Sequence, residues 1–237
     1  MTKVAIMDGD ELVDTLLRPT GFNSAVTAEE LKQSLEEMGH SIAEADVVAT
    51  GYGRISVPYA NKTVTEITCH GRGAAWLFGP DGTVLDVGGQ DTKVIQLKGG
   101  KVKKFVMNDK CSAGTGKFLE VMADRMGVTQ EQLAELAAAG NPTTISSMCT
   151  VFAESEVISL VGQGKPKEDI ANGVIESVVG RVVSLAGQFS AEAYFLTGGL
   201  CENAYIIERL ATGLGCPVSS DPRARYAGAI GAALSAR

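Results

Sequence analysis

The sequence lacks any uninterrupted apolar run near the roughly 18 residues that a membrane-spanning helix needs. It also lacks a secretory signal, because residues 1–8 reach an acidic side chain before a long apolar stretch has formed. Positive charge is in the minority: 21 Lys and Arg stand against 28 Asp and Glu, and the formal net charge is −7. We therefore expect neither a membrane protein, nor an exported protein, nor a general nucleic-acid binder.

Cysteine is scarce and its count is odd. Five cysteines cannot all pair in disulfides within one chain. Together with the missing export signal, this predicts a reducing, cytoplasmic compartment in which thiols are available to a metal. The chain also lacks Pro- or Ser-rich linkers, and its 237 residues fit one large domain or two small lobes.

Two of the cysteines precede apolar residues at helical spacing. Cys111 lies in the stretch NDKCSAGTG (108–116), and Cys149 lies in SSMCTV (146–151). Each is predicted to open a helix, whose N-terminal partial positive charge favours a thiolate. Two thiolates are half of a four-cysteine iron–sulfur site, and a symmetric dimer would supply the other half. Spacing alone leaves open the alternative that both are buried small hydrophobes.

Two stretches offset by 90 residues share one pattern. Residues 2–13 and 92–103 each predict a strand, a turn with glycine and a second strand. This favours two lobes built on one plan, although β-hairpins also resemble one another by chance. The second copy is preceded by residues 82–91, whereas nothing equivalent precedes the first copy. We therefore expect a strand and its loop to be missing from the first lobe.

Residues 82–91 predict a buried strand that runs into a glycine turn with Asp86 and Asp91 on either side. Glycines let main-chain N–H groups approach a phosphate closely, and nearby carboxylates can hold Mg²⁺. A simple hairpin turn would give the same pattern. Residues 193–200 predict another buried strand, which ends at Gly198 and Gly199. A helix follows. A strand, glycine turn and helix is a common arrangement for binding a nucleotide, but many α/β proteins contain such turns only for packing.

Helical periodicity and capping residues indicate further helices, at residues 27–38 (with Thr27 as N-cap), 65–76, 130–139, 170–187 and 204–214. A strand that ends in a glycine turn is predicted at residues 47–54. Cys69 and His70 are adjacent in a helix and point about 100° apart, so they make a poor metal pair. Cys201 and Cys216 have no Cys or His at ligand spacing and are predicted not to be ligands.

Residues 49–54, 86–91, 108–116, 146–157 and 197–203 together make the chain similar to a known family. It resembles the ATP-dependent activators (component A) of 2-hydroxyacyl-CoA dehydratases and the related benzoyl-CoA reductase ATPase subunits, over nearly the whole chain. The resemblance implies an α/β fold of the actin/sugar-kinase/Hsp70-like class, with two lobes around a nucleotide cleft. The first lobe would be residues 1–80 and the second residues 81–237, with the C-terminal segment returning to the first. The family opens with a strand and an Asp-x-Gly-Ser turn that this chain lacks.

The resemblance also implies the roles of individual residues. Cys111 and Cys149 would be ligands of one [4Fe–4S] cluster at a homodimer interface. ATP or ADP would bind with Mg²⁺, and the residues implied in nucleotide binding and turnover are Asp86 and Gln90 as catalytic groups, Gly88 and Gly89 in the phosphate turn, and Gly198, Gly199 and Asn203 near the adenosine.

The implied activity is one-electron transfer driven by ATP, from ferredoxin or flavodoxin to a separate iron–sulfur dehydratase or reductase. No nucleic acid or membrane would take part. A small-molecule kinase of the same fold is an alternative, but it leaves the paired cysteines unexplained. A regulatory homologue that does not hydrolyse ATP is another, favoured by the missing phosphate turn.

Overall fold

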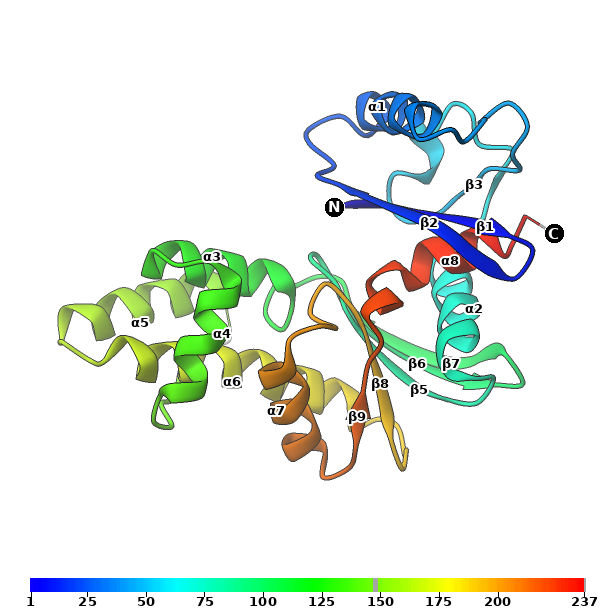
Figure 1. Cartoon of the computed structure of the whole chain (residues 1–237). Coiled ribbons are helices and arrows are strands. Elements are labelled where there is room, and N and C mark those ends of the chain that lie inside the picture. The colour runs from blue at the N-terminus through cyan, green and yellow to red at the C-terminus, as the bar shows by residue number, and fades with distance from the viewer. Residues whose placement is uncertain (147–148, 237) are drawn as a thin grey trace. The chain divides into compact units, whose positions relative to one another are not determined.

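The computed structural model describes residues 1–146 and 149–236, and the chain divides into two compact units (Figure 1). Unit 1 comprises Met1–Asp81, Leu97–Lys103 and Arg223–Arg237. Unit 2 comprises Gly82–Gln96 and Lys104–Pro222. The C-terminal segment therefore belongs to the same unit as the N-terminal segment.

Unit 1 is built from a β-hairpin, a short pair of parallel strands and helices. The hairpin predicted at residues 2–13 is present: β1 (Thr2–Asp8) pairs antiparallel with β2 (Glu11–Arg18). The other elements are α1 (Ser24–Glu37), β3 (Val48–Ala49), η1 (Arg54–Ser56), β4 (Lys62–Thr63), α2 (Glu66–Phe78) and α8 (Ala227–Ala233), which η2 (Pro222–Tyr226) precedes.

The helices α2 and α8 pack backbone against backbone. A Cβ at Gly231 of α8 would collide with the main-chain carbonyl of Cys69 in α2, so glycine is required for this approach. Arg72 strengthens the contact by donating to the Leu234 carbonyl at 3.0 Å and the Ser235 hydroxyl at 2.9 Å. Cys69 is fully buried here, and burial raises the pKa of its thiol. A buried neutral thiol fits the expectation that Cys69 packs and does not bind metal.

One sequence-based expectation for unit 1 is wrong, and another is confirmed. The N-cap of α1 is Asn23, whose side chain accepts from the Ala25 amide at 3.0 Å, and Thr27 lies buried inside the helix. Asn is as good an N-cap as Thr, and it stands where the chain leaves the extended conformation. The strand predicted to run into a glycine turn within residues 47–54 is confirmed, because β3 ends at Ala49 and the backbone turns at Gly51, which has a positive φ.

Unit 2 is organised by a five-stranded sheet with the order β7-β6-β5-β8-β9, of which the tip of the β6–β7 hairpin belongs to unit 1. The strands are β5 (Gly82–Val87), β6 (Thr92–Lys98), β7 (Lys101–Asn108), β8 (Tyr194–Gly198) and β9 (Val218–Ser219). β5 and β8 are parallel, with Asp86 opposite Thr197 and Val87 opposite Gly198. Their carboxyl ends therefore lie side by side, which is where α/β sheets hold ligands.

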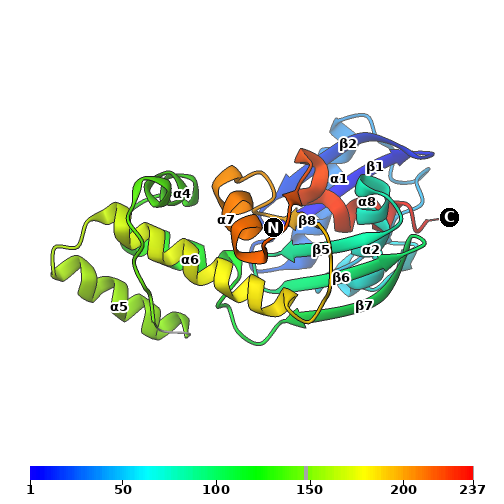
Figure 2. The same cartoon turned by 90° about the horizontal axis from the view of Figure 1, so that it is seen from below.

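Helices flank this sheet and form a group beyond it (Figure 1). They are α3 (Gly116–Met126), α4 (Gln130–Ala139), α5 (Thr150–Gly162), α6 (Lys167–Ala186) and α7 (Ala204–Leu214). The long helix α6 is central, because Val174, Val178 and Val182 recur at helical spacing and are buried. α5 runs alongside α6 (Figure 2). In the described part of the chain, no helix is long and apolar enough to cross a membrane.

Candidate functional site

The first part of the candidate site is the turn between β5 and β6. Asp86 stands next to the last residue of β5, and the main-chain N–H of Gly88 donates to the Asp91 carbonyl at 2.9 Å, which closes the turn. Gly89 and Gln90 are exposed at its tip, whereas Asp86 and Asp91 are each 4% exposed. The turn thus presents exposed main chain beside two buried carboxylates.

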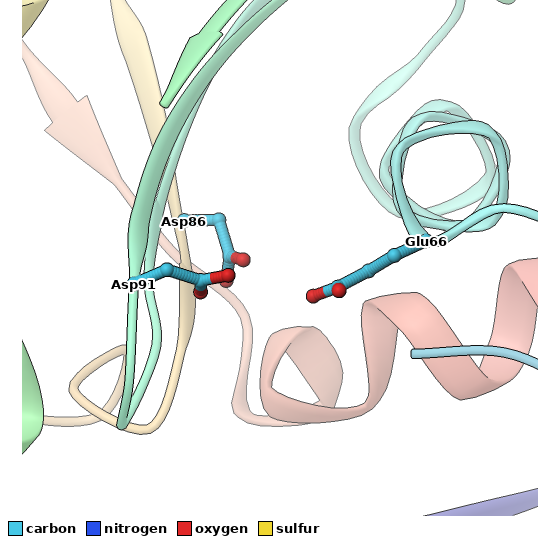
Figure 3. A group of neighbouring side chains, drawn as sticks. All are labelled: Glu66, Asp86 and Asp91. Atoms are coloured by element: carbon cyan, nitrogen blue, oxygen red, sulfur yellow. The ribbon is translucent and has the colours of Figure 1, made fainter. Parts of the chain in front are cut away.

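A lysine that the sequence analysis missed joins these carboxylates. The Nζ of Lys93 lies 3.2 Å from Asp86 Oδ2 and 2.5 Å from Asp91 Oδ1, and the lysine is 1% exposed. Figure 3 shows the two aspartates turned toward the same side of β5 and β6. The Thr197 hydroxyl lies 3.3 Å from Asp86 Oδ1, so the neighbouring strand β8 also supports the network. The signal in the sequence was weak, because this strand also contains Thr92, Gln96 and Lys98, and only the burial of Lys93 demands an opposite charge.

The glycine pair at the end of β8 adjoins this network. The N–H of Gly199 donates to the Val87 carbonyl at 3.2 Å. Gly198 has φ +90°, and a Cβ there would lie 2.8 Å from Asp86 Oδ1 and collide with the Val87 carbonyl. The structure therefore brings together the ends of β5 and β8, which are more than a hundred residues apart in sequence.

Asn203 has a structural task at this edge of the sheet. It is the N-cap of α7, and its Oδ1 accepts from the Ile206 amide at 3.0 Å. The side-chain oxygen of Asn203 thus starts the helix that follows the glycine pair. Within the described residues no hydrogen bond uses its amide nitrogen, which is free to donate in the role the resemblance implied.

The two cysteine motifs differ in their relation to helices. Cys149 is the N-cap of α5, as predicted. The prediction for Cys111 is wrong: α3 begins at Gly116 with Thr115 as N-cap, so Cys111 lies in the loop before the helix. The hydroxyl of Thr115 donates to the Ser112 carbonyl at 2.7 Å, which makes the intervening residues a turn of their own. Ser147 and Met148 of the second motif lie outside the described residues.

A hydrogen bond joins the two motifs directly. The Ser112 and Thr150 hydroxyls, each one residue beyond a cysteine, are 2.8 Å apart. Consecutive Cα atoms are about 3.8 Å apart, so this bond keeps the two cysteine segments adjacent. Both Cys111 and Cys149 are exposed, which excludes the alternative that they are buried hydrophobes. Cys69 and Cys201 are buried and Cys216 is half-buried.

The loop that carries Cys111 is fixed at both ends. The Asn108 amide donates to the carbonyls of Cys111 and Ala113, both at 2.9 Å. A cavity of about 220 Å³ adjoins the loop and is lined by Cys111, Asn108, Gly114 and Arg181, among others. The exposed thiol of Cys111 and the cationic side chain of Arg181 thus line one small cavity.

The cysteine loop is also hydrogen-bonded to the glycine turn. The N–H of Gly116 donates to the Gly88 carbonyl at 2.8 Å, and the N–H of Lys117 donates to the Gly89 carbonyl at 3.0 Å. The Thr92 hydroxyl donates to the Gly114 carbonyl at 2.6 Å. The first turn of α3 therefore rests on the turn between β5 and β6, and the two predicted sites form one continuous structure within unit 2.

The helix that Cys149 opens has an exposed apolar surface. The exposed large apolar side chains of α5 are Val151, Phe152, Ile158 and Val161. Val151 and Ile158 are two helical turns apart and lie on the same face. Apolar side chains gathered beside an exposed cysteine are typical of a surface that another protein covers.

Comparison with known proteins agrees with this geometry. The (R)-2-hydroxyglutaryl-CoA dehydratase activating ATPase of Acidaminococcus fermentans is 42% identical over 98% of this chain and 91% of its own length. The crystal structure of that dehydratase's component A matches with a TM-score of 0.90 over 97% of this chain and 90% of its own.

The activator of the 2-hydroxyisocaproyl-CoA dehydratase from Clostridium difficile, with bound ADPNP, matches with a TM-score of 0.88. It is 35% identical over 99% of this chain and 89% of its own. A ROK family glucokinase from Streptomyces griseus, 14% identical with a TM-score of 0.58 over 98% of this chain and 94% of its own, shares the fold alone. The predicted actin/sugar-kinase-like α/β fold is thereby confirmed. The BadF/BadG/BcrA/BcrD ATPase family matches residues 1–236, and this chain belongs to it.

Proposed function

We propose that this chain is an ATP-dependent one-electron transfer protein that reductively activates a separate iron–sulfur enzyme. The partner would be of the 2-hydroxyacyl-CoA dehydratase or benzoyl-CoA reductase type. The observation that carries the proposal is the hydrogen bonding of Gly116 and Lys117 to the glycine turn, which places the cysteine loop on the proposed nucleotide site. The relatives named as dehydratase activators support the choice of partner.

The two cysteines provide half of a cluster site. Cys111 and Cys149 are exposed and held in neighbouring segments, which suits a pair of thiolate ligands. The same two residues of a second copy would complete four thiolates across a two-fold axis. The exposed apolar residues of α5 would be covered in such a homodimer. A [4Fe–4S] cluster, when bound, would supply the one-electron step.

The glycine turn and its neighbours would hold the nucleotide. Gly88 is half-buried and shapes the turn, the exposed main chain at Gly89 can approach phosphate oxygens, and Gln90 at the tip can orient a water. Asp86 would act on Mg²⁺ through water, because its own oxygens already face Lys93 and Thr197. Gly198, Gly199 and the amide of Asn203 would lie toward the adenosine.

Coupling would follow from the contacts between these parts. When the turn moves on nucleotide binding or hydrolysis, its carbonyls displace the first turn of α3 and the loop of Cys111 with it. The bond between Ser112 and Thr150 passes the shift to the start of α5. Such a local change with a distant readout is a common switching design. Ferredoxin or flavodoxin is the proposed electron donor.

The test is anaerobic reconstitution with iron and sulfide. We expect about four irons per dimer. Cys111→Ser and Cys149→Ser should lose the iron and the brown colour, whereas Cys216→Ser, at a half-buried cysteine away from both motifs, should keep them. Full iron in Cys149→Ser would overturn the cluster assignment. Phosphate release by the reconstituted protein then tests the ATPase separately.

A further inference from the structure

Lys93 is a charged residue of unit 2 for which neither the sequence analysis nor the proposed activity provides a role. It stands in β6, two residues beyond Asp91, and its side chain is among the largest that are fully buried. Its Nζ contacts Asp86 Oδ2 at 3.2 Å and Asp91 Oδ1 at 2.5 Å. The ammonium group thus bridges one carboxylate of β5 and one of the turn that follows this strand.

Burial makes this bridge a requirement. Two carboxylates with little access to water repel one another and would take up a proton or a cation. The Thr197 hydroxyl can serve Asp86 Oδ1, but a neutral hydroxyl does not balance charge. Lys93 supplies the positive charge from within the chain. The Lys93 ammonium therefore balances the charge of the two aspartates without a bound metal ion.

The position of that cation is where a metal would bridge the same oxygens. Mg²⁺ binds carboxylate oxygens at about 2.0–2.1 Å, commonly through one or two carboxylates together with substrate phosphates. Two aspartates with oxygens within reach of one point form such a donor set. Here the point is taken by Nζ, and a divalent ion bound directly to both aspartates would have to displace a buried ammonium.

We propose that Lys93 prevents direct divalent-metal binding by Asp86 and Asp91, so that the turn accepts Mg²⁺ only together with nucleotide phosphates. The inference rests on the proposed nucleotide site, and it makes Lys93 a positioning residue for that site. The phosphates and waters supply the ligands that the lysine withholds, and Asp86 acts from the outer shell of the ion. The nucleotide-free protein then has no metal at the turn, which keeps the metal and the nucleotide bound as one unit.

The test adds Mn²⁺ without nucleotide to the full chain. Electron paramagnetic resonance measures how much of the Mn²⁺ is bound. We expect no wild-type site at this turn and a new site in Lys93→Ala that binds Mn²⁺ at least about tenfold more tightly. Lys93→Ala/Asp91→Asn should lose the new site. Lys117→Ala is the matched control, because it removes an equal charge from an exposed pair with Glu120.

Two results would overturn the inference. One is wild-type protein that binds Mn²⁺ without nucleotide as tightly as Lys93→Ala does. The other is folded Lys93→Ala that gains no site. If Lys93→Ala does not fold, the wild-type measurement and Lys93→Arg, which keeps the cation and should bind no Mn²⁺, still decide. Adding ADP separates the two proposals: a wild type that binds no Mn²⁺ even with ADP contradicts the nucleotide site, while the metal-alone comparison stands by itself.

Discussion

The main-chain N–H of Gly116 donates to the carbonyl oxygen of Gly88 at 2.8 Å, so the first residue of α3 is fixed to the turn that follows β5. A helix normally leaves its first N–H groups without partners inside the helix. Here the N–H groups of Gly116 and Lys117 donate to carbonyl oxygens of the glycine turn. Any shift of the turn must therefore move α3 or break these bonds.

The third bond between these parts can be removed by a single change. Thr92→Val keeps the side-chain shape but deletes the buried donor to the Gly114 carbonyl. We expect the free energy of unfolding to fall by about 1–2 kcal/mol, and the Cys111 thiol to react faster with a thiol reagent. Thr212→Val is the control, since that hydroxyl bonds within an exposed turn of α7. Equal reactivity of Cys111 in wild type and Thr92→Val would contradict the link.

The close approach of β8 to β5 gives a second prediction. Ala at Gly198 would be strained by the positive φ and would press on the Val87 carbonyl. We expect Gly198→Ala to lower the free energy of unfolding by about 1–3 kcal/mol. Gly199→Ala is the matched control, because nothing lies within 4 Å of its Cβ position. Chemical denaturation of both variants makes the comparison, and equal stability would refute the strain.

The sequence predicted best where local signals decide the structure. The helices at residues 130–139 and 204–214 have the predicted bounds, because N-caps and closing glycines act within a few residues. The strand ending at Gly198 was likewise predicted from a buried run before a glycine pair. These features need no knowledge of the rest of the fold.

The errors arose where distant residues decide. Cys111 lies outside α3 because the loop up to Gly116 is held by Asn108 and by the glycine turn. Lys93 resembled an exposed strand residue in sequence, yet it is buried because Asp86 and Asp91 surround its charge. The bond between Ser112 and Thr150 spans 38 residues and has no pattern in the sequence at all.

A third prediction concerns turnover. Asp86→Asn keeps a hydrogen-bonding side chain beside Thr197 but removes the charge that the proposed site directs at Mg²⁺. We expect ATP hydrolysis to fall by about two orders of magnitude, the usual scale for loss of a positioned group at a reacting phosphate, with iron content unchanged. Asp81→Asn is the control, since that carboxylate is exposed and pairs with Lys98. Unchanged phosphate release by Asp86→Asn would refute the role.

A fourth prediction concerns acid stability. The Asn141 main-chain amide donates to Asp169 Oδ1 at 2.8 Å and holds the pKa of that carboxyl below its usual 3.8. A pKa lowered by folding stabilises the protein above the unfolded value, and this stabilisation is lost as the pH falls through the folded value. The free energy of unfolding of Asp169→Asn should therefore be lower than that of wild type at neutral pH. It should also change less than that of wild type as the pH falls from 7 into the acid range. Glu135→Gln, at an exposed position of α4, is the control. Melting temperatures are measured across this pH range. An equal change of melting temperature with pH in Asp169→Asn and wild type would contradict the prediction.

The last prediction concerns the exposed face of α5. Phe152 is 68% exposed, three residues beyond Cys149, and in the proposed homodimer it would be covered by the second copy. Phe152→Glu would place a charge in that interface, where burial without a partner is costly. We expect the dimer to dissociate at least about tenfold more readily and the cluster to be lost with it, because each chain alone offers two of four thiolates. Sedimentation velocity and iron analysis measure the two effects. Phe105→Glu is the control, since Phe105 is 48% exposed on β7 and has no place in the proposed interface. A Phe152→Glu protein that stays dimeric with full iron, while Cys149→Ser loses its iron, would move the interface elsewhere and leave the cysteine assignment standing.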